Sequence, residues 1–162
     1  NWGYRSRFDS LSEIAEDLYH DIKNNSSSDT VSFVTHSLGG LVVRSMLNFS
    51  KSDSTFPIIN RIVMLSPPNE GSHVAHFFAS MKISRIIAGP NLEILQTDSL
   101  SKAKQLPIPY DAEVGIIAGI WVEGKGYNPF IEGEDDMLVT PDQMKLGVEK
   151  DFIKVKVYIG IY

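Results

Sequence analysis

The sequence predicts an α/β fold in which a mostly parallel sheet is flanked by helices. Short apolar, β-branched segments alternate with segments whose apolar residues recur at helical spacing. One such apolar segment, Val31 to Val34, leads through a glycine-containing turn directly into an amphipathic stretch. The chain has 162 residues, 43% hydrophobic and 22% charged, which is enough for a single globular domain over residues 1–162.

The amino-terminal part is predicted to contain one helix between irregular segments. Residues 1–8 are expected to be the end of a strand and a turn. Asp9 or Ser10 then caps a helix, because both residue types favour that position. Residues 24–29 form a polar loop. The buried face of the helix is expected to hold Leu11, Ile14, Ala15, Leu18, Tyr19 and Ile22.

The next segment carries the most specific pattern in the chain. Residues 31–35 are predicted to be a buried strand, residues 35–40 a tight turn, and the following residues a helix to about Asn48. A strand that turns sharply into a helix with serine at the apex is the pattern of a nucleophile elbow. Ser-x-Gly alone is common, but the apolar strand and the amphipathic helix around it make the pattern specific. Thr35 stands where this motif usually has its first glycine, and Gly39 is expected to be required because a Cβ there would collide with a neighbouring element.

Three further strands are predicted, at residues 61–66, 113–119 and 152–159. The turn-rich loop 67–72 follows the first, and Ser72 can cap a further helix. Residues 82–110 are mixed, with a short helix near 92–95.

A long acidic loop, residues 124–136, follows the strand at 113–119. A short helix is expected after Thr140-Pro141, since Thr suits the N-cap and Pro the first helical position. Functional groups gather at the carboxyl edge of parallel sheets. Ser37 and the loops 67–72 and 124–136 all follow predicted strands, so we expect a site there.

These motifs together resemble the α/β-hydrolase superfamily, in particular bacterial esterases and lipases. The similarity is to small lipases and to hydrolases related to GPI inositol-deacylase. It implies a partial α/β-hydrolase fold and an ester-hydrolysing activity that uses a serine nucleophile. The matching blocks are Asn1-Trp2-Gly3-Tyr4-Arg5-Ser6, residues 33–40, residues 64–72 and Gly133-Glu134-Asp135-Asp136-Met137-Leu138-Val139.

The resemblance assigns roles to a few residues. Ser37 is the expected nucleophile, and the backbone N–H of Leu38 is the expected oxyanion donor. Asp136 is the expected catalytic acid, with Asp135 as the second choice. Two other interpretations of the acidic loop stay open: a solvated surface loop, or a calcium site that would also use Glu132 and Glu134.

The histidine expected of such a triad should follow the acid in the sequence. All four histidines precede Asp136, and they are His20, His36, His73 and His76. His36 is expected to pack beneath the turn, and His73 and His76 are weak candidates for the base. We therefore interpret the chain as incomplete, without the amino-terminal strands and the terminal histidine segment of the family. The alternative is a non-catalytic pseudo-hydrolase.

Composition excludes some function classes and leaves others open. The net charge of −5 gives no indication of a surface that binds nucleic acid. The sequence contains no run of about 18 apolar residues, so it does not predict a transmembrane helix. No cysteine is present, so thiolate chemistry is excluded. The expected partner is a small-molecule or lipid ester, with no cofactor and no metal. Acyl transfer uses the same serine chemistry and stays possible. The compartment, with the cytoplasm slightly favoured, and the oligomeric state stay open.

Overall fold

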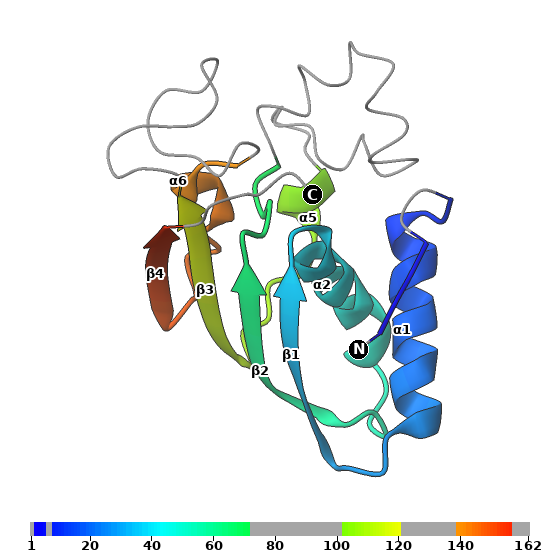
Figure 1. The fold of residues 1–162 in the computed structure, drawn as a ribbon. Helices are drawn as coiled ribbons and strands as arrows, with labels where there is room; N and C mark the ends of the chain where they lie inside the picture. The colour runs from blue at the N-terminus through cyan, green and yellow to red at the C-terminus, as the bar shows by residue number, and fades with distance from the viewer. Residues whose placement is uncertain (1, 6–7, 72–101, 121–138, 157–162) are drawn as a thin grey trace.

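Four parallel strands form one sheet whose spatial order follows the sequence (Figure 1). The computed structural model describes residues 2–5, 8–71, 102–120 and 139–156. The strands are β1 (Thr30–His36), β2 (Ile58–Leu65), β3 (Glu113–Ile120) and β4 (Asp151–Lys156). All four carboxyl ends point to the same end of the sheet (Figure 1), where Ser37 directly follows β1. The predicted α/β architecture is confirmed.

In the described part of the chain, four helices accompany the strands: α1 (Leu11–Asn25), α2 (Leu38–Ser50), α5 (Lys102–Gln105) and α6 (Pro141–Met144). Helix α2 packs beside β1, and α1 lies against α2 (Figure 1). Buried apolar side chains of α1, α2, β2 and β3 meet in one core. The fully buried side chains of this core include Ile14, Leu41, Val42, Met46, Ile62, Met64, Val114, Ile116 and Met144.

Local chemistry explains where the helices begin. Ser10, rather than Asp9, caps α1: its hydroxyl accepts from the Glu13 N–H, and the Glu13 carboxylate accepts from the Ser10 N–H, which is a capping box. Helix α6 starts after Thr140 with Pro141 at its first turn, as predicted. Helix α5 was not predicted, because its four residues are too few for a periodic pattern.

Two predicted segments differ from the structure. Residues 2–5 form no strand. The strand β1, predicted to be buried, alternates between exposed and half-buried residues, and Val34 is 78% exposed. The physical reason is the place of β1 in the sheet. Among the described residues β1 is an outer strand, so one of its faces and one of its edges have no described neighbour.

Other predicted features lie outside the described residues. They are the helix from Ser72, the short helix near 92–95, the acidic loop 124–136, and the end of the last strand beyond Lys156. No helix in the described part of the chain is long and apolar enough to cross a bilayer.

A polar cluster fastens the end of α1 to the loop before β2. The Asp53 carboxylate accepts hydrogen bonds from the Lys23 ammonium at 2.5 Å and the Tyr19 hydroxyl at 2.5 Å. The Tyr19 ring stacks on Phe56 with centroids 5.3 Å apart. The pKa of the Asp53 carboxyl lies well below its usual range, mainly because of the hydrogen bond from the Lys23 ammonium. The hydrogen bonds from Thr55 and Tyr19 lower it further. The cluster therefore stabilises the fold while Asp53 is ionised.

This cluster predicts a specific pH dependence of stability. The folded-state pKa of Asp53 lies below the unfolded value of about 4, so the unfolded chain takes up the proton first. The contribution is complete above pH about 4 and is lost as the pH falls towards the folded-state pKa. Asp53→Asn should therefore flatten the acid side of the stability profile, measured as melting temperature between neutral and acid pH. Asp17→Asn, which alters an exposed carboxylate on α1, is the control. Parallel profiles for wild type and Asp53→Asn would contradict this assignment.

Candidate active site

The sharp turn after β1 places Ser37 at the start of α2. The turn, residues 35–40, is called the serine turn below. Ser37 has φ 51° and ψ −124°, a left-handed conformation that costs free energy for a residue with a Cβ. Its N–H donates to the Leu65 carbonyl at 2.9 Å, and the Gly40 N–H donates to the Ser37 carbonyl at 3.0 Å. Pairing with β2 and the first turn of α2 thus hold the strained backbone.

The Ser37 hydroxyl is free among the described residues. Serine at this helix position usually accepts a hydrogen bond from a first-turn N–H, but Ser37 makes no such capping bond. The first N–H groups of a helix have no intrahelical acceptor, and they favour negative charge. Leu38 is the first residue of α2, so its N–H belongs to this set. The arrangement offers an uncommitted hydroxyl beside donors that suit a developing oxyanion.

The close contact in the serine turn is at Gly40 and not at Gly39, which corrects the sequence prediction. A Cβ on Gly39 would lie 3.5 Å from the Thr35 Cβ, an ordinary contact. A Cβ on Gly40 would lie 3.2 Å from the Pro67 Cβ and 3.4 Å from the Met64 sulfur. Gly40 faces β2 and the loop that follows it, and this packing is long-range and not readable from local spacing.

This difference predicts opposite outcomes for two neighbouring substitutions. Gly39→Ala should stabilise the protein by about 0.5–1 kcal/mol, because alanine favours the helix and meets only ordinary contacts. Gly40→Ala should be less stable than Gly39→Ala by about 1–3 kcal/mol, because the new methyl group overpacks against Pro67 and Met64. Urea denaturation of both variants measures the difference. Equal stabilities would mean that the loop after β2 moves to accommodate the methyl group at no cost in the free energy of unfolding.

A second left-handed serine lies at the end of the adjacent strand. Ser66 has φ 44°, and it follows Leu65, the register partner of His36 in β1. Its N–H donates to the Ile117 carbonyl at 2.9 Å, and its hydroxyl accepts from the Gly119 N–H at 3.2 Å. No role was predicted for Ser66 from the sequence, because no local sequence pattern indicates its left-handed backbone.

The loop after β2 is fixed by the buried side chain of Arg44 on α2. The guanidinium donates to the carbonyl of Asn69 at 3.2 Å and to its side-chain oxygen at 3.1 Å. It also donates to the carbonyls of Leu106 at 2.8 Å and Pro107 at 3.1 Å. Burial lowers the pKa of Arg44 to about 10, so it stays charged at neutral pH. Sequence reasoning missed this residue because its partners are distant in the chain.

Two of the four histidines can be placed. His20 is exposed on α1, with its Nε2 3.9 Å from Glu16. His36 is exposed at the end of β1, which corrects the expectation that it packs beneath the serine turn. His73 and His76 lie outside the described residues, as do Asp135 and Asp136. Of the predicted site residues, the structure therefore describes Ser37 and Leu38, whereas the catalytic acid at Asp136 or Asp135 stays a prediction.

The calcium interpretation also depends on residues that are not described. Glu132, Glu134, Asp135 and Asp136 all lie in the undescribed range 121–138. Among the remaining acidic and histidine side chains, within the described ranges, no three come together as a metal-ligand set.

A cavity of about 390 Å³ adjoins the serine turn on the side of β1. It reaches Thr35, His36 and Gly39, while Ser37 and Leu38 do not line it. The remaining lining residues are Trp2, Tyr4, Leu18, Phe33, Val34, Val42 and Val43. Burial raises the pKa of the Tyr4 hydroxyl, so this group stays protonated at neutral pH. The cavity thus lies beside the turn with a lining that is partly apolar and partly polar, and a tyrosine hydroxyl lies on its wall.

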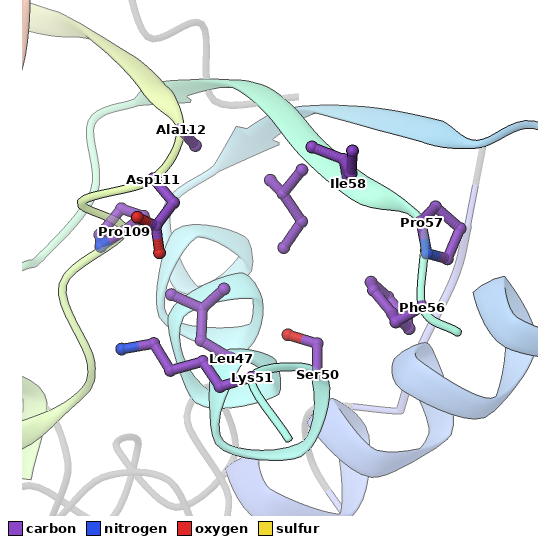
Figure 2. Close-up of a pocket in the computed structure, with 10 residues that line it drawn as sticks. Leu47, Ser50, Lys51, Phe56, Pro57, Ile58, Pro109, Asp111 and Ala112 are labelled. Atoms are coloured by element: carbon purple, nitrogen blue, oxygen red, sulfur yellow. The ribbon is translucent and has the colours of Figure 1, made fainter. Parts of the chain in front are cut away.

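A smaller pocket of about 210 Å³ lies at the opposite end of the sheet (Figure 2). Leu47, Phe56 and Ile58 give it an apolar lining, with Lys51 and Asp111 as its charged residues. These residues come from the end of α2 and from the segments at or before the starts of β2 and β3. This pocket is therefore remote from Ser37 and belongs to a different part of the molecule.

Comparisons with known proteins point to one class of fold. Residues 10–84 match the family described as "Putative serine esterase (DUF676)", a range that contains the serine turn. The structure is similar to the mature lipase BlEst2 of Bacillus licheniformis, with a TM-score of 0.68 and 18% identity over 91% of this chain and 67% of the lipase. It is also similar to phospholipase PlaB of Legionella pneumophila, with a TM-score of 0.67 and 19% identity over 89% of this chain.

This chain covers only part of the length of each similar structure. The chain spans 36% of the length of PlaB and 36% of the propeptide form of BlEst2. No curated protein sequence matches it. At these identities the structural likeness concerns the fold, which is the α/β-hydrolase fold of these lipases.

Proposed function

We propose that this chain, whose fold is that of α/β-hydrolases of the esterase and lipase type, carries the nucleophile of a serine ester hydrolase. The observation that carries the proposal is Ser37: a left-handed serine at a strand-to-helix turn with no hydrogen bond on its hydroxyl among the described residues. A structural serine would cap the helix or be replaced without loss by glycine, which adopts this backbone more readily. The match of residues 10–84 to a serine esterase family supports the same conclusion.

The proposed reaction has two steps. The Ser37 oxygen attacks the ester carbonyl carbon while a base takes its proton, and the tetrahedral oxyanion accepts a hydrogen bond from the Leu38 N–H. The carbonyl re-forms, the alcohol leaves with a proton, and an acyl-enzyme remains. Water then attacks the acyl-enzyme and releases the carboxylic acid and Ser37. Asp136, or Asp135 as the second choice, would hold the base in position.

The proposed substrate is a carboxylic ester with an apolar acyl chain. The names lipase and phospholipase of the two similar structures favour a lipid ester. Apolar side chains form part of the lining of the cavity beside the serine turn, and they could contact such a chain. No metal or organic cofactor has a role in the proposed steps, and acyl transfer to an alcohol would follow the same first step.

A second candidate function is a non-catalytic module that retains the fold and binds esters. The two histidines that the structure describes, His20 and His36, are exposed, and no hydrogen bond joins either of them to the Ser37 hydroxyl. In this alternative the pocket binds a ligand without turnover.

An added base separates the two candidates. If Ser37 is presented for catalysis, imidazole in solution should act as the base and raise the rate of p-nitrophenyl ester hydrolysis by about 10²-fold. The measurement compares acetate and decanoate esters with the purified full chain and with Ser37→Ala, each at increasing imidazole. The variant gives the reaction of imidazole itself. A saturating, Ser37-dependent increase is the expected result, and identical curves for both proteins would favour the binding module.

A further inference from the structure

The Arg44 guanidinium is a buried cation that none of its described partners neutralises. Its side chain lies in the interior, 1% exposed, and the four acceptors that it has within the described ranges are neutral oxygens. Removing a charge from water is costly unless a charge of opposite sign accompanies it. An apolar side chain at this position of α2 would avoid that cost. The feature that only arginine provides is the planar fork of donors, which binds several oxygens in a fixed relative geometry.

The fork holds the loop that follows β2. The main acceptor residue is Asn69, which takes two of the four bonds through its carbonyl and its side-chain oxygen. The Asn69 amide donates in turn to the Met144 carbonyl of α6 at 2.6 Å. The neighbouring Glu70 N–H donates to the Gln143 carbonyl at 2.9 Å. The loop is therefore fixed between α2 on one side and α6 on the other.

The same loop packs directly on the serine turn. Pro67 lies so close to Gly40 that a Cβ on Gly40 would come within 3.2 Å of it. The Leu65 carbonyl, two residues before Pro67, accepts the Ser37 N–H. Movement of the loop would consequently act on both ends of the strained segment, at Ser37 and at Gly40. Arg44 itself lies on α2, two helical turns after Ser37.

We propose that Arg44 and Asn69 are positioning residues for Ser37: their hydrogen bonds fix the loop 67–71, and this loop keeps the serine turn in its left-handed geometry. The consequence for reactivity rests on the proposed esterase function, whereas the consequence for backbone geometry does not. Neither residue contacts the reacting atoms in this account.

The test uses one substitution of Arg44 that keeps its positive charge and one substitution of its main acceptor residue, Asn69. Arg44→Lys retains a cation but cannot reach oxygens of Asn69, Leu106 and Pro107 together. Asn69→Asp keeps an acceptor for Arg44 and loses the amide that donates to Met144. Hydrogen–deuterium exchange of the peptide covering residues 34–41 reports backbone geometry without any activity. We expect exchange at Ser37 and Gly40 to rise by about tenfold in both variants. Labelling by an alkyl fluorophosphonate with imidazole present as the base, scaled to the folded fraction, should fall by about tenfold in both.

A matched control separates positioning from loss of stability. Ile14→Ala on α1 creates a cavity in the core away from the loop 67–71. All variants are compared at the same interval below their own melting temperatures. Ile14→Ala should leave the exchange of residues 34–41 and the labelling per folded molecule within about twofold of wild type. If Arg44→Lys and Asn69→Asp behave like Ile14→Ala in exchange, the proposal is overturned. If the wild type does not label but the exchange differs as expected, positioning stands and the esterase proposal fails.

Discussion

With imidazole present as the base, Ser37→Ala should reduce labelling of the full chain by an alkyl fluorophosphonate to background, a loss of about 10³-fold or more. The reagent forms a bond to an activated serine oxygen, and Ser37 lies at a helix N-terminus with a hydroxyl that makes no hydrogen bond to the described part of the chain. The substitution removes one oxygen from a partly exposed turn, so the fold should persist. Intact-mass spectrometry after timed exposure measures the covalent adduct directly.

Two other serines make this experiment decisive. Ser32→Ala alters an exposed serine on β1, and the labelling of this variant should equal that of the wild type. Ser66 is the second left-handed serine, at the end of the adjacent strand. Labelling that survives in Ser37→Ala but disappears in the double Ser37→Ala, Ser66→Ala variant would assign the nucleophile to Ser66. Labelling that is equal in wild type and Ser37→Ala would remove the basis for the proposed function.

Arg44→Met should lower the free energy of unfolding by about 3 kcal/mol. Methionine fills much of the volume of the arginine stem, but the four oxygens that the guanidinium serves lose their donor. Orphaned buried acceptors cost about 1–3 kcal/mol each, and the relief of guanidinium desolvation offsets part of the sum. For a chain of this length the expected fall in melting temperature is about 6–12 °C.

Arg61 provides the matched control for this comparison. It is 65% exposed and pairs with Glu113 at 3.0 Å, so Arg61→Met removes a surface ion pair and a charge of the same kind. Surface pairs contribute about 0–1 kcal/mol, and the expected change is correspondingly small. If Arg44→Met is as stable as wild type or more stable, desolvation outweighs the hydrogen bonds, and Arg44 then contributes no net stability.

The features that could be predicted from the sequence are those that local chemistry decides. The capping of α1 by Ser10 and the start of α6 at Thr140-Pro141 depend on residues within one turn of each other. The parallel sheet followed from the alternation of apolar strands and helices. The strand, turn and helix around Ser37 lie within about 20 consecutive residues, so their order was also readable.

The features that escaped prediction depend on contacts between distant segments. The exposure of Val34 follows from the place of β1 in the sheet, which strand composition does not encode. The close packing of Gly40 depends on Pro67 in the loop after β2. The bonds of Arg44 span 25 to 63 residues, and a lone arginine in an amphipathic helix would ordinarily be placed on its solvated face. The acid at Asp136 stays a prediction.

The bond from the Ser37 N–H to the Leu65 carbonyl has a consequence for the order of assembly. Ser37 leaves the ribosome 28 residues before Leu65, its hydrogen-bond partner. A nascent chain that ends before β2 therefore contains the complete Thr-His-Ser-Leu-Gly-Gly motif without the pairing that holds its backbone. Since local interactions alone do not favour left-handed serine, this geometry is acquired only when β2 docks. Reactivity of the serine during synthesis should accordingly begin with the closure of the β1–α2–β2 unit, and not with the appearance of the motif.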